Sequence, residues 1–282
     1  MDGDHSALEA DWLGACRRAT ERLGEMLAAH PRTADRAIET GEIGSGGDRT
    51  LVIDEAAESI VLEELERLHR QGHRFTAVSE ERGVVPFGGT DVRVIIDPID
   101  GSVNAKRLLP HYALSVAVAS GTVMADVEFG FVHDFGPSEE WWARRGAGAW
   151  LNGSQLDPGL RERRDRDGRL ELLGIEAADP RLVRKSIDQL VDRAYRLRAI
   201  GALAPALCQV AAARLDGVVS LRPCRAVDVA AATLIVREGG GVVSFPRCPD
   251  PPLGCALDPE PHSPVAAARS AESLRALELV VA

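Results

Sequence analysis

Hydrophobic residues recur at helical spacing near the start of the chain. From Leu8 to Ala29 the apolar positions lie three or four residues apart, which predicts an amphipathic helix that ends before Pro31. The same spacing over about 54–68 predicts a second helix. The glycine-rich stretch Gly41 to Gly47 separates the two patterns and predicts a loop.

The pattern then changes to β-branched and alternating residues. Val92 to Ile96 predicts a strand that delivers Asp97 at its end. Asn152-Gly153 is a strong hairpin-turn signal. Further strands are predicted over residues 112–119, 123–132, 140–143 and 149–151.

The second half of the chain alternates between short apolar runs and helical patterns. Strands are predicted over 170–175, 196–200, 218–221 and 265–268, and helices over 202–214, 228–238 and 271–279. Pro246 to Pro264 carries seven prolines and predicts a long loop. The charged stretch 160–169 marks a boundary, so we expect an α+β half over 1–160 and an α/β half over 161–282. The fold class is therefore a layered α/β (α+β) sandwich in which helices cover sheets.

Composition narrows the functional classes. The formal net charge of −10 argues against a nucleic-acid partner, because proteins that bind nucleic acids usually have a basic surface. Five widely spaced cysteines without a C-x-x-C pair argue against a disulfide framework or a zinc site. The polar, acidic start is unlike a signal peptide, and no apolar run reaches membrane-spanning length. We therefore expect a cytoplasmic protein with no membrane partner.

The strongest chemical feature is the segment from Asp97 to Ser102, which reads D-P-I-D-G-S. Two carboxylates this close at the end of a strand must have their repulsion offset, because at ~4 Å and an effective dielectric near 20 they repel by roughly 4 kcal/mol. A bound cation or a shared proton would relieve that repulsion. Oxygen ligands without cysteine or histidine favour Mg²⁺, Mn²⁺ or Ca²⁺. The alternative interpretation is a surface turn, for which the same residues are also suited.

Three other acidic segments have structural readings when each is taken alone. Glu80 and Glu81 follow a short strand-like run and would suit a solvated acidic turn. Asp228 opens a predicted helix, where an acid is usually an N-cap. Asp54 stands at the start of the second predicted helix and invites the same interpretation.

Together and in this order, these segments resemble the inositol monophosphatase family. Its superfamily of lithium-sensitive phosphatases also includes fructose-1,6-bisphosphatases. The family's T-x-x-x-D element matches residues 50–54, and its G-E-E-like element matches 79–81. Its D-P-[IL]-D-G-[TS]-x-N element matches 97–104, with Ser102 in place of threonine. Its W-D-x-A-A…E-x-G-G element matches 227–240, with Val227 in place of tryptophan. Residues 146–153 resemble its G-x-G-A-x-x-N-G hairpin, and 265–268 its closing strand. The resemblance covers nearly the whole chain and implies the layered sandwich of fructose bisphosphatases.

The resemblance also implies a mechanism. It implies a phosphatase that uses two or three Mg²⁺ ions, with Mn²⁺ as the alternative, and that hydrolyses a phosphomonoester with metal-activated water. The implied metal ligands are Glu80, Asp97, the Ile99 carbonyl, Asp100 and Asp228, and the implied catalytic groups are Asp54, Ser102 and Glu80. The implied substrate contacts are Gly101, Ser102, Arg107, Gly201, Ala202 and Arg222.

The sequence within these motifs most resembles that of archaeal-type enzymes that act on both inositol phosphate and fructose 1,6-bisphosphate. Leu221 falls where animal enzymes place a glutamate that grips inositol hydroxyls, which weakens selectivity for inositol. Arginines near Arg222 would suit a second phosphate. The resemblance thus implies a small phosphorylated metabolite as substrate and a homodimer. The alternatives are a 3′-phosphoadenosine 5′-phosphate or histidinol-phosphate phosphatase, or a catalytically silent phosphate-ligand-binding protein.

Overall fold

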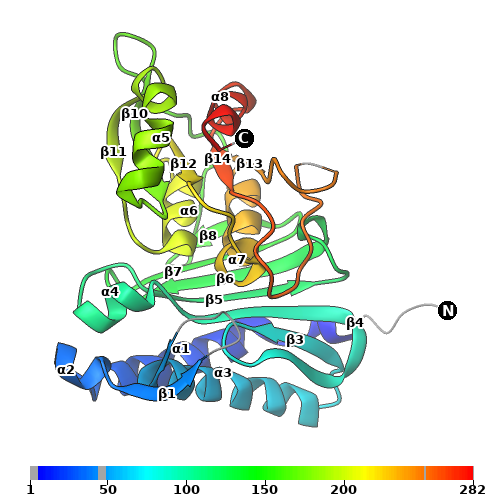
Figure 1. The fold of residues 1–282 in the computed structure, drawn as a ribbon. Coiled ribbons are helices and arrows are strands. Elements are labelled where there is room, and N and C mark those ends of the chain that lie inside the picture. Colours follow the sequence, from blue (N-terminus) through cyan, green and yellow to red (C-terminus); the bar gives the residue numbers. More distant parts are fainter. Residues whose placement is uncertain (1–5, 44–48, 251, 282) are drawn as a thin grey trace.

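A computed structural model describes residues 6–43, 49–250 and 252–281, and its elements stack in layers (Figure 1). Helices α1 and α3 cover one face of a seven-stranded sheet, and helices α6 and α7 cover the other. A five-stranded sheet packs on the far side of α6 and α7, and helices α5 and α8 close the stack. The predicted layered sandwich is confirmed. The helices span Trp12–Ala28 (α1), Val52–Arg70 (α3), Pro180–Val191 (α5), Leu203–Ala211 (α6), Ala226–Glu238 (α7) and Ala271–Val281 (α8).

The first predicted helix begins later than the pattern suggested. A short 3₁₀ helix, η1 (Ser6–Glu9), precedes α1. Between them the Asp11 side chain accepts a hydrogen bond from the Gly14 N–H at 2.9 Å, which is the N-cap that starts α1. The apolar stripe therefore continues across two helices that are separated by a cap.

The seven-stranded sheet has the order β3-β4-β5-β6-β7-β8-β9. Strand β4 doubles back, so that Ser79 at the end of β3 pairs with both Gly83 and Ile96. Predicted strand 123–132 starts too early, because Asp126 accepts a hydrogen bond from the Val123 N–H and folds residues 124–126 into the 3₁₀ helix η2 (Met124–Asp126). The strands are Phe75–Ser79 (β3), Gly83–Asp100 (β4), Ala113–Ala119 (β5), Val127–Asp134 (β6), Glu139–Arg144 (β7), Gly148–Leu151 (β8) and Ser154–Gln155 (β9).

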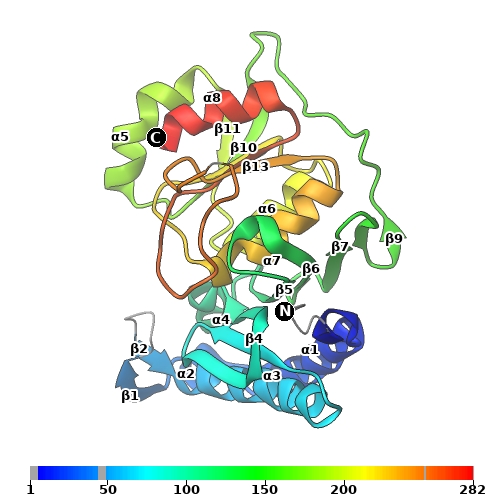
Figure 2. The same ribbon diagram turned by 90° about the vertical axis from the view of Figure 1, so that its right-hand side faces the viewer.

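The five-stranded sheet has the order β11-β10-β12-β14-β13, with parallel pairing around β10 and antiparallel pairing around β14. Figure 2 shows it above the seven-stranded sheet, with α5 and α8 outside it. The seven-stranded sheet is therefore formed before residue 156 and the five-stranded sheet after residue 169, although the division at residue 160 stays a prediction. The strands are Leu170–Glu176 (β10), Ala194–Arg198 (β11), Gly217–Ser220 (β12), Val242–Ser244 (β13) and Ala266–Ala268 (β14).

Helix α5 is absent from the sequence-based expectations. Its apolar residues Val183, Ile187, Leu190 and Val191 recur at helical spacing, so the sequence does carry an amphipathic pattern that the predictions omit, although only Leu190 is buried. Its start carries a different signal. The Asp179 side chain accepts a hydrogen bond from the Arg181 N–H at 2.8 Å, and Pro180 stands in the first turn. The remaining short elements are α2 (Thr33–Arg36), α4 (Ser102–Arg107), β1 (Glu39–Ile43) and β2 (Arg49–Leu51). Of the predicted loop 41–47, residues 41–43 instead belong to β1, so that part of the prediction is wrong, and residues 44–47 lie outside the described part of the chain.

The proline-rich stretch after Phe245 is a loop, as predicted, but its cysteines correct another expectation. Cys248 and Cys255 form a disulfide, with their Cα atoms 5.1 Å apart. A spacing of seven residues is not a pattern that predicts a disulfide. The odd number of cysteines argued against a disulfide framework, but it does not exclude one local pair. The loop folds back on itself and brings both side chains into the interior.

Arg269 joins the ends of the two central helices. Its guanidinium donates hydrogen bonds to the carbonyls of Ala211 at 3.0 Å and Gly239 at 2.7 Å, at the C-terminal ends of α6 and α7. It also donates to the Leu160 carbonyl at 2.8 Å, in the segment that connects the two sheets. Arg269 is 7% exposed, so this buried cation is matched by carbonyl oxygens.

No helix among residues 6–43, 49–250 and 252–281 is long and apolar enough to cross a membrane.

Candidate metal and phosphate site

The end of β4 brings two carboxylates to the middle of the fold. Asp97 pairs with Ser115 of β5 and Asp100 pairs with Ala113, and the register shifts between these two positions. The Asp97 carboxylate accepts a hydrogen bond from the Ile99 N–H at 3.0 Å, which fixes the bulged turn. Asp97 is 2% exposed and Asp100 is 8% exposed. The D-P-I-D segment is therefore buried and is not a surface turn.

Asp100 is held by the start of α6. Its two carboxylate oxygens accept hydrogen bonds from the N–H groups of Leu203 at 3.3 Å and Ala204 at 2.6 Å. These N–H groups are unpaired within the helix, and the positive end of the helix dipole favours an anion there. Asp100 thus joins the end of β4 to a helix of the second half of the chain.

Gly101 and Gly201 allow the two halves to approach closely here. Gly101 has φ +86°, and a Cβ added to it would lie 2.8 Å from the Ala202 Cβ. Gly201 has φ +83° and packs against the Asn104 side chain. The Asn104 amide in turn donates to the Ile200 carbonyl at 2.9 Å. The structure therefore brings the predicted substrate-contact residues Gly101, Gly201 and Ala202 together.

Asp228 lies in the first turn of α7 and is linked to Glu80 through Arg225. The Arg225 Nη2 atom is 2.6 Å from Glu80 Oε1 and 3.0 Å from Asp228 Oδ1. The Arg225 backbone N–H also donates to Asp228 Oδ2 at 2.9 Å. One guanidinium nitrogen thus bridges two of the predicted metal ligands.

The four predicted carboxylate ligands act on one another electrostatically. Burial raises the pKa of Asp97 well above its usual range, and the charges of Glu80, Asp100 and Asp228 raise it further. Burial and the charge of Asp228 raise the pKa of Asp100, while its hydrogen bonds to Ala204 and Leu203 lower it. Burial also raises the pKa of Asp228, and Arg225 opposes this. The cluster is therefore a place where positive charge is needed.

Asp54 lies in the first turn of α3, where its side chain is half-buried. One turn later the Glu58 carboxylate is 1% exposed and accepts hydrogen bonds from the Ser79 hydroxyl and from the Arg82 N–H at 3.0 Å. These bonds fasten α3 to the segment that carries Glu80, on the same side as Asp54. Of the matched T-x-x-x-D element, Asp54 belongs to the described side chains and Thr50 does not.

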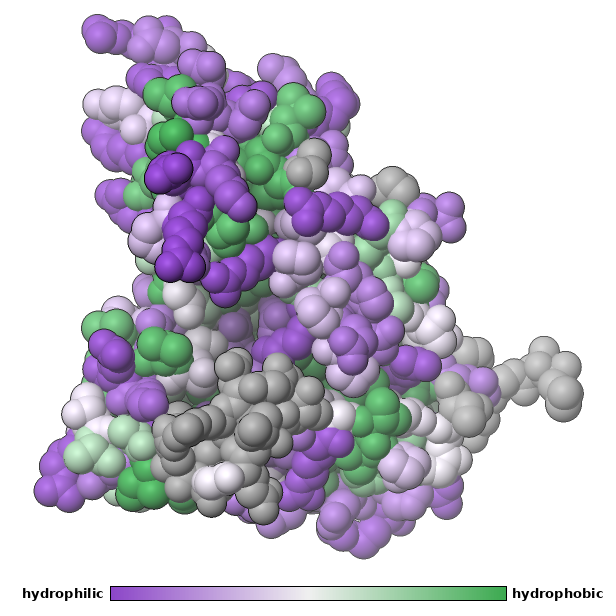
Figure 3. Space-filling model, viewed as in Figure 1, coloured by the Kyte–Doolittle hydropathy of each residue, from purple (hydrophilic) through white to green (hydrophobic). Residues whose placement is uncertain are grey.

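A pocket of about 660 Å³ opens beside this cluster and reaches both Asp100 and Asp228. Figure 3 shows the surface hollowed between the part that holds the five-stranded sheet and the part that holds the seven-stranded sheet. The predicted contacts Gly201, Ala202 and Arg222 line the pocket. Ser102 begins α4 and Arg107 ends it, and neither is among the lining residues. Their predicted roles stay predictions.

Two features of the pocket were missed in the sequence. Glu176 ends β10, is 4% exposed and accepts hydrogen bonds from the Ile200 and Gly201 N–H groups at 2.8 and 2.9 Å. In the sequence, Glu176 is a single acidic residue at the end of a predicted strand and belongs to no motif, so nothing marked it as a pocket residue. Glu260, with its proline neighbours, reaches the pocket from the disulfide-bonded loop, and no local pattern predicts where such a loop folds.

The donor set fits Mg²⁺ or Mn²⁺. It consists of two buried carboxylates, Asp97 and Asp100, and two half-buried ones, Glu80 and Asp228, whose mutual repulsion a divalent ion would offset, and it contains no cysteine or histidine. Within the described residues, however, no three such side chains are drawn together as closely as the ligands of one ion. Arg225 lies between two of them. Metal binding would therefore require small side-chain movements.

Comparison with known proteins gives this geometry a context. The family model described as "Inositol monophosphatase family" matches residues 10–281. The chain belongs to the inositol monophosphatase family. The Nus factor SuhB of Escherichia coli is 34% identical over 237 residues, which cover 82% of this chain and 84% of that protein. A fructose-1,6-bisphosphatase/inositol-1-monophosphatase of Thermococcus kodakarensis is 35% identical over 246 residues, covering 85% and 86%.

Solved structures agree with this membership of the inositol monophosphatase family. A crystal structure described as an inositol monophosphatase–fructose 1,6-bisphosphatase superposes with a TM-score of 0.78 at 25% identity. The match covers 96% of this chain and all of that one. The resemblance seen in the sequence is thus confirmed at the level of family and fold.

Proposed function

We propose that this protein is a magnesium-dependent phosphomonoesterase that acts on small sugar or polyol phosphates, with inositol 1-phosphate and fructose 1,6-bisphosphate as the first candidates. The observation that carries the proposal is the cluster of the buried Asp97 and Asp100 with the half-buried Asp228 beside a pocket, in a chain of the inositol monophosphatase family. A catalytically silent relative would be expected to have lost one of these acids, and none is lost.

The residues suit specific tasks. Glu80, Asp97, Asp100, Asp228 and the Ile99 carbonyl would hold two or three Mg²⁺ ions, with Mn²⁺ as the alternative. Such ions supply charge neutralisation and a water of lowered pKa when they are bound. Asp54 and the Ser102 hydroxyl, with Glu80, would orient the attacking water and accept its proton.

The pocket would bind the rest of the substrate. The backbone of Gly101 and Ser102 would contact the phosphate that is cleaved. The neutral backbone around Gly201 and Ala202 would face the sugar or polyol, and Arg222 would pair with a second anionic group. Arg222 now forms an ion pair with Asp179 at 2.8 Å, so it would exchange one anion for another.

A screen of phosphate release over inositol, sugar, nucleotide and histidinol phosphates tests this proposal. We expect hydrolysis of inositol 1-phosphate and fructose 1,6-bisphosphate that is abolished by EDTA and restored by Mg²⁺. Activity that persists in excess EDTA would contradict the mechanism. Preference for 3′-phosphoadenosine 5′-phosphate or histidinol phosphate would keep the chemistry and change the substrate.

A role as a Nus factor is a second candidate, because the SuhB proteins of E. coli carry that name at 34% identity. The net charge of −10 speaks against direct contact with nucleic acid. Gel-shift assays with RNA at low salt distinguish the two roles, and we expect no shift. We also propose a homodimer, as in the family it resembles, which sedimentation would test.

A further inference from the structure

Arg225 is held by two of the proposed metal ligands at once. Its Nη2 atom donates to Glu80 Oε1 at 2.6 Å and to Asp228 Oδ1 at 3.0 Å, although Glu80 and Arg225 are 145 residues apart in the chain. Its backbone N–H donates to the other Asp228 oxygen at 2.9 Å. The Arg225 side chain is 22% exposed and the Asp228 side chain 18%, so water screens these charges only partly.

A cation that bridges two carboxylates uses the oxygen lone pairs that a metal ion needs. Mg²⁺ binds oxygen at about 2.0–2.1 Å and requires ligands placed with near-ideal geometry. A guanidinium at hydrogen-bond distance from the same two oxygens would repel that ion and hold the ligands apart. The failure of any three described acidic side chains to converge is consistent with this arrangement.

We infer that Arg225 is an internal counter-ion of the metal site, which pairs with Glu80 and Asp228 and is displaced from them when Mg²⁺ binds. This inference rests on the proposed function, because it takes these acids as metal ligands. Arg225 is thus a positioning residue: it keeps the acidic cluster neutralised and competes with the metal for it.

The displaced guanidinium has a place to go. Arg225 itself lines the pocket, together with Arg222 and Glu260. Once its carboxylate partners bind the metal, its positive charge is available to an anion in that pocket. Metal binding would then raise the affinity of the pocket for phosphate. The Arg225 side chain would thus favour an order in which Mg²⁺ binds before phosphate.

Calorimetric titration with Mg²⁺ tests the inference on wild type, Arg225→Gln and Arg225→Lys. We expect Arg225→Gln to bind Mg²⁺ about tenfold more tightly, the effect of one lost charge-assisted competitor. In EDTA the same variant should melt at a lower temperature, because the carboxylates lose their counter-ion. Its gain in melting temperature on adding Mg²⁺ should exceed that of wild type. Arg225→Lys keeps the positive charge, so its Mg²⁺ affinity and melting temperature should lie between those of wild type and Arg225→Gln. It also serves as the folded comparison if the glutamine variant is unstable.

Arg222→Gln is the matched control. It removes one positive charge from the same pocket, but the described ion pair of Arg222 is with Asp179 and not with a metal carboxylate. We expect its Mg²⁺ affinity to change by less than about twofold. If Arg222→Gln tightens binding as much as Arg225→Gln, the effect is general electrostatics and the inference is overturned.

Two other outcomes are informative. Arg225→Gln that binds Mg²⁺ as weakly as wild type, or more weakly, would reduce Arg225 to a structural ion pair while leaving the metal site intact. Wild type that binds no Mg²⁺, with titrations the same as those of Asp97→Asn, would instead refute the metal site itself, and with it both proposals.

Discussion

The Asp100 carboxylate lies 2.6 Å from the backbone nitrogen of Ala204, across 104 positions of the chain. One acid therefore ends a strand of the first sheet and caps a helix between the sheets. Because Asp97 and Asp228 act on Asp100 and on each other, the charge state of the cluster depends on how the two halves meet. Activity and stability should consequently respond together when this cluster is changed.

Asp97→Asn should separate metal binding from folding. We expect kcat to fall by about 10³-fold or more, because charge stabilisation by a held metal is worth several kcal/mol. In EDTA at pH 7 the variant should melt at a higher temperature than wild type. The folded protein raises the pKa of Asp97, so its ionisation opposes folding at pH values above the unfolded pKa. Scanning calorimetry with and without Mg²⁺ measures this.

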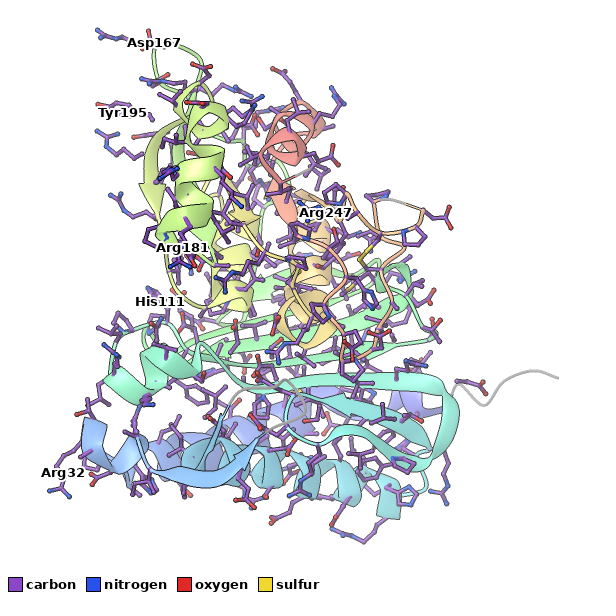
Figure 4. All side chains as sticks on the ribbon, in the orientation of Figure 1. Arg32, His111, Asp167, Arg181, Tyr195 and Arg247 are labelled. Carbon is purple, nitrogen blue, oxygen red and sulfur yellow. A yellow bond between two sulfur atoms is a disulfide. The ribbon has the colours of Figure 1, made fainter. Side chains whose placement is uncertain are left out.

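The control for Asp97→Asn is Asp167→Asn, at the tip of the exposed turn labelled in Figure 4. We expect it to keep both the activity and the Mg²⁺-induced rise in melting temperature. An Asp97→Asn enzyme with near wild-type turnover would remove Asp97 from the metal site.

Ser102→Ala tests the proposed water-positioning hydroxyl. We expect kcat to fall by roughly 10²–10⁴, the usual scale of assistance to proton transfer. Ser102→Thr should stay active, because it keeps the hydroxyl and is the residue found in the resembled family. Ser102 is the first residue of α4 and follows the N-cap Gly101, so it is not the capping residue and neither change should unfold the protein. Steady-state kinetics with circular dichroism as a folding check decide between these outcomes.

Arg222→Ala should distinguish two substrates. Pairing with a second phosphate contributes ~1.5–3 kcal/mol, the range for hydrogen bonds to charged groups. We expect kcat/KM for fructose 1,6-bisphosphate to fall by at least about tenfold, and for inositol 1-phosphate by much less. Arg181→Ala is the control, because Arg181 is an exposed residue of α5 near Asp179 (Figure 4) and is not among those that line the pocket. Equal losses on both substrates would exclude Arg222 from the second-phosphate role.

Glu176 should make stability depend on pH. Burial raises its pKa to about 7, although hydrogen bonds from Ile200 and Gly201 lower it. Because the folded state binds this proton more tightly than the unfolded state, the contribution of Glu176 to stability falls as pH rises from about 4.5 to about 7. Glu176→Gln should flatten that part of the profile, by up to ~1.4 kcal/mol per pH unit. Urea unfolding tests this for Glu176→Gln and for the control Glu171→Gln, a residue of the same strand whose side chain is 47% exposed.

The sequence predicted most helices and strands because their patterns are local. α3 follows from its apolar periodicity and β5 from a continuous, nearly all-apolar run, and the fold class follows from the order of such elements. α5 was missed although Val183, Ile187 and Leu190 recur at helical spacing, and the disulfide was missed because Cys248 and Cys255 meet only through the fold of a proline-rich loop.

The candidate site was predictable in part for a different reason. Asp97, Asp100 and Asp228 stand in motifs whose order identifies the family, so their approach could be anticipated from resemblance. Glu176 and Arg225 owe their contacts to tertiary geometry. No pattern along the chain indicates that the Arg225 guanidinium would lie between Glu80 and Asp228.

The hydrogen bonds of Arg269 have a consequence for the direction of the electric field inside the protein. α6 and α7 both start at the acidic cluster, and both end at the Arg269 guanidinium. They therefore run parallel, and their dipoles add instead of cancelling. The negative ends are neutralised by one buried cation, while both positive ends face the pocket. An anion that enters the hollow in Figure 3 thus meets two aligned helix dipoles, in addition to whatever charges surround it.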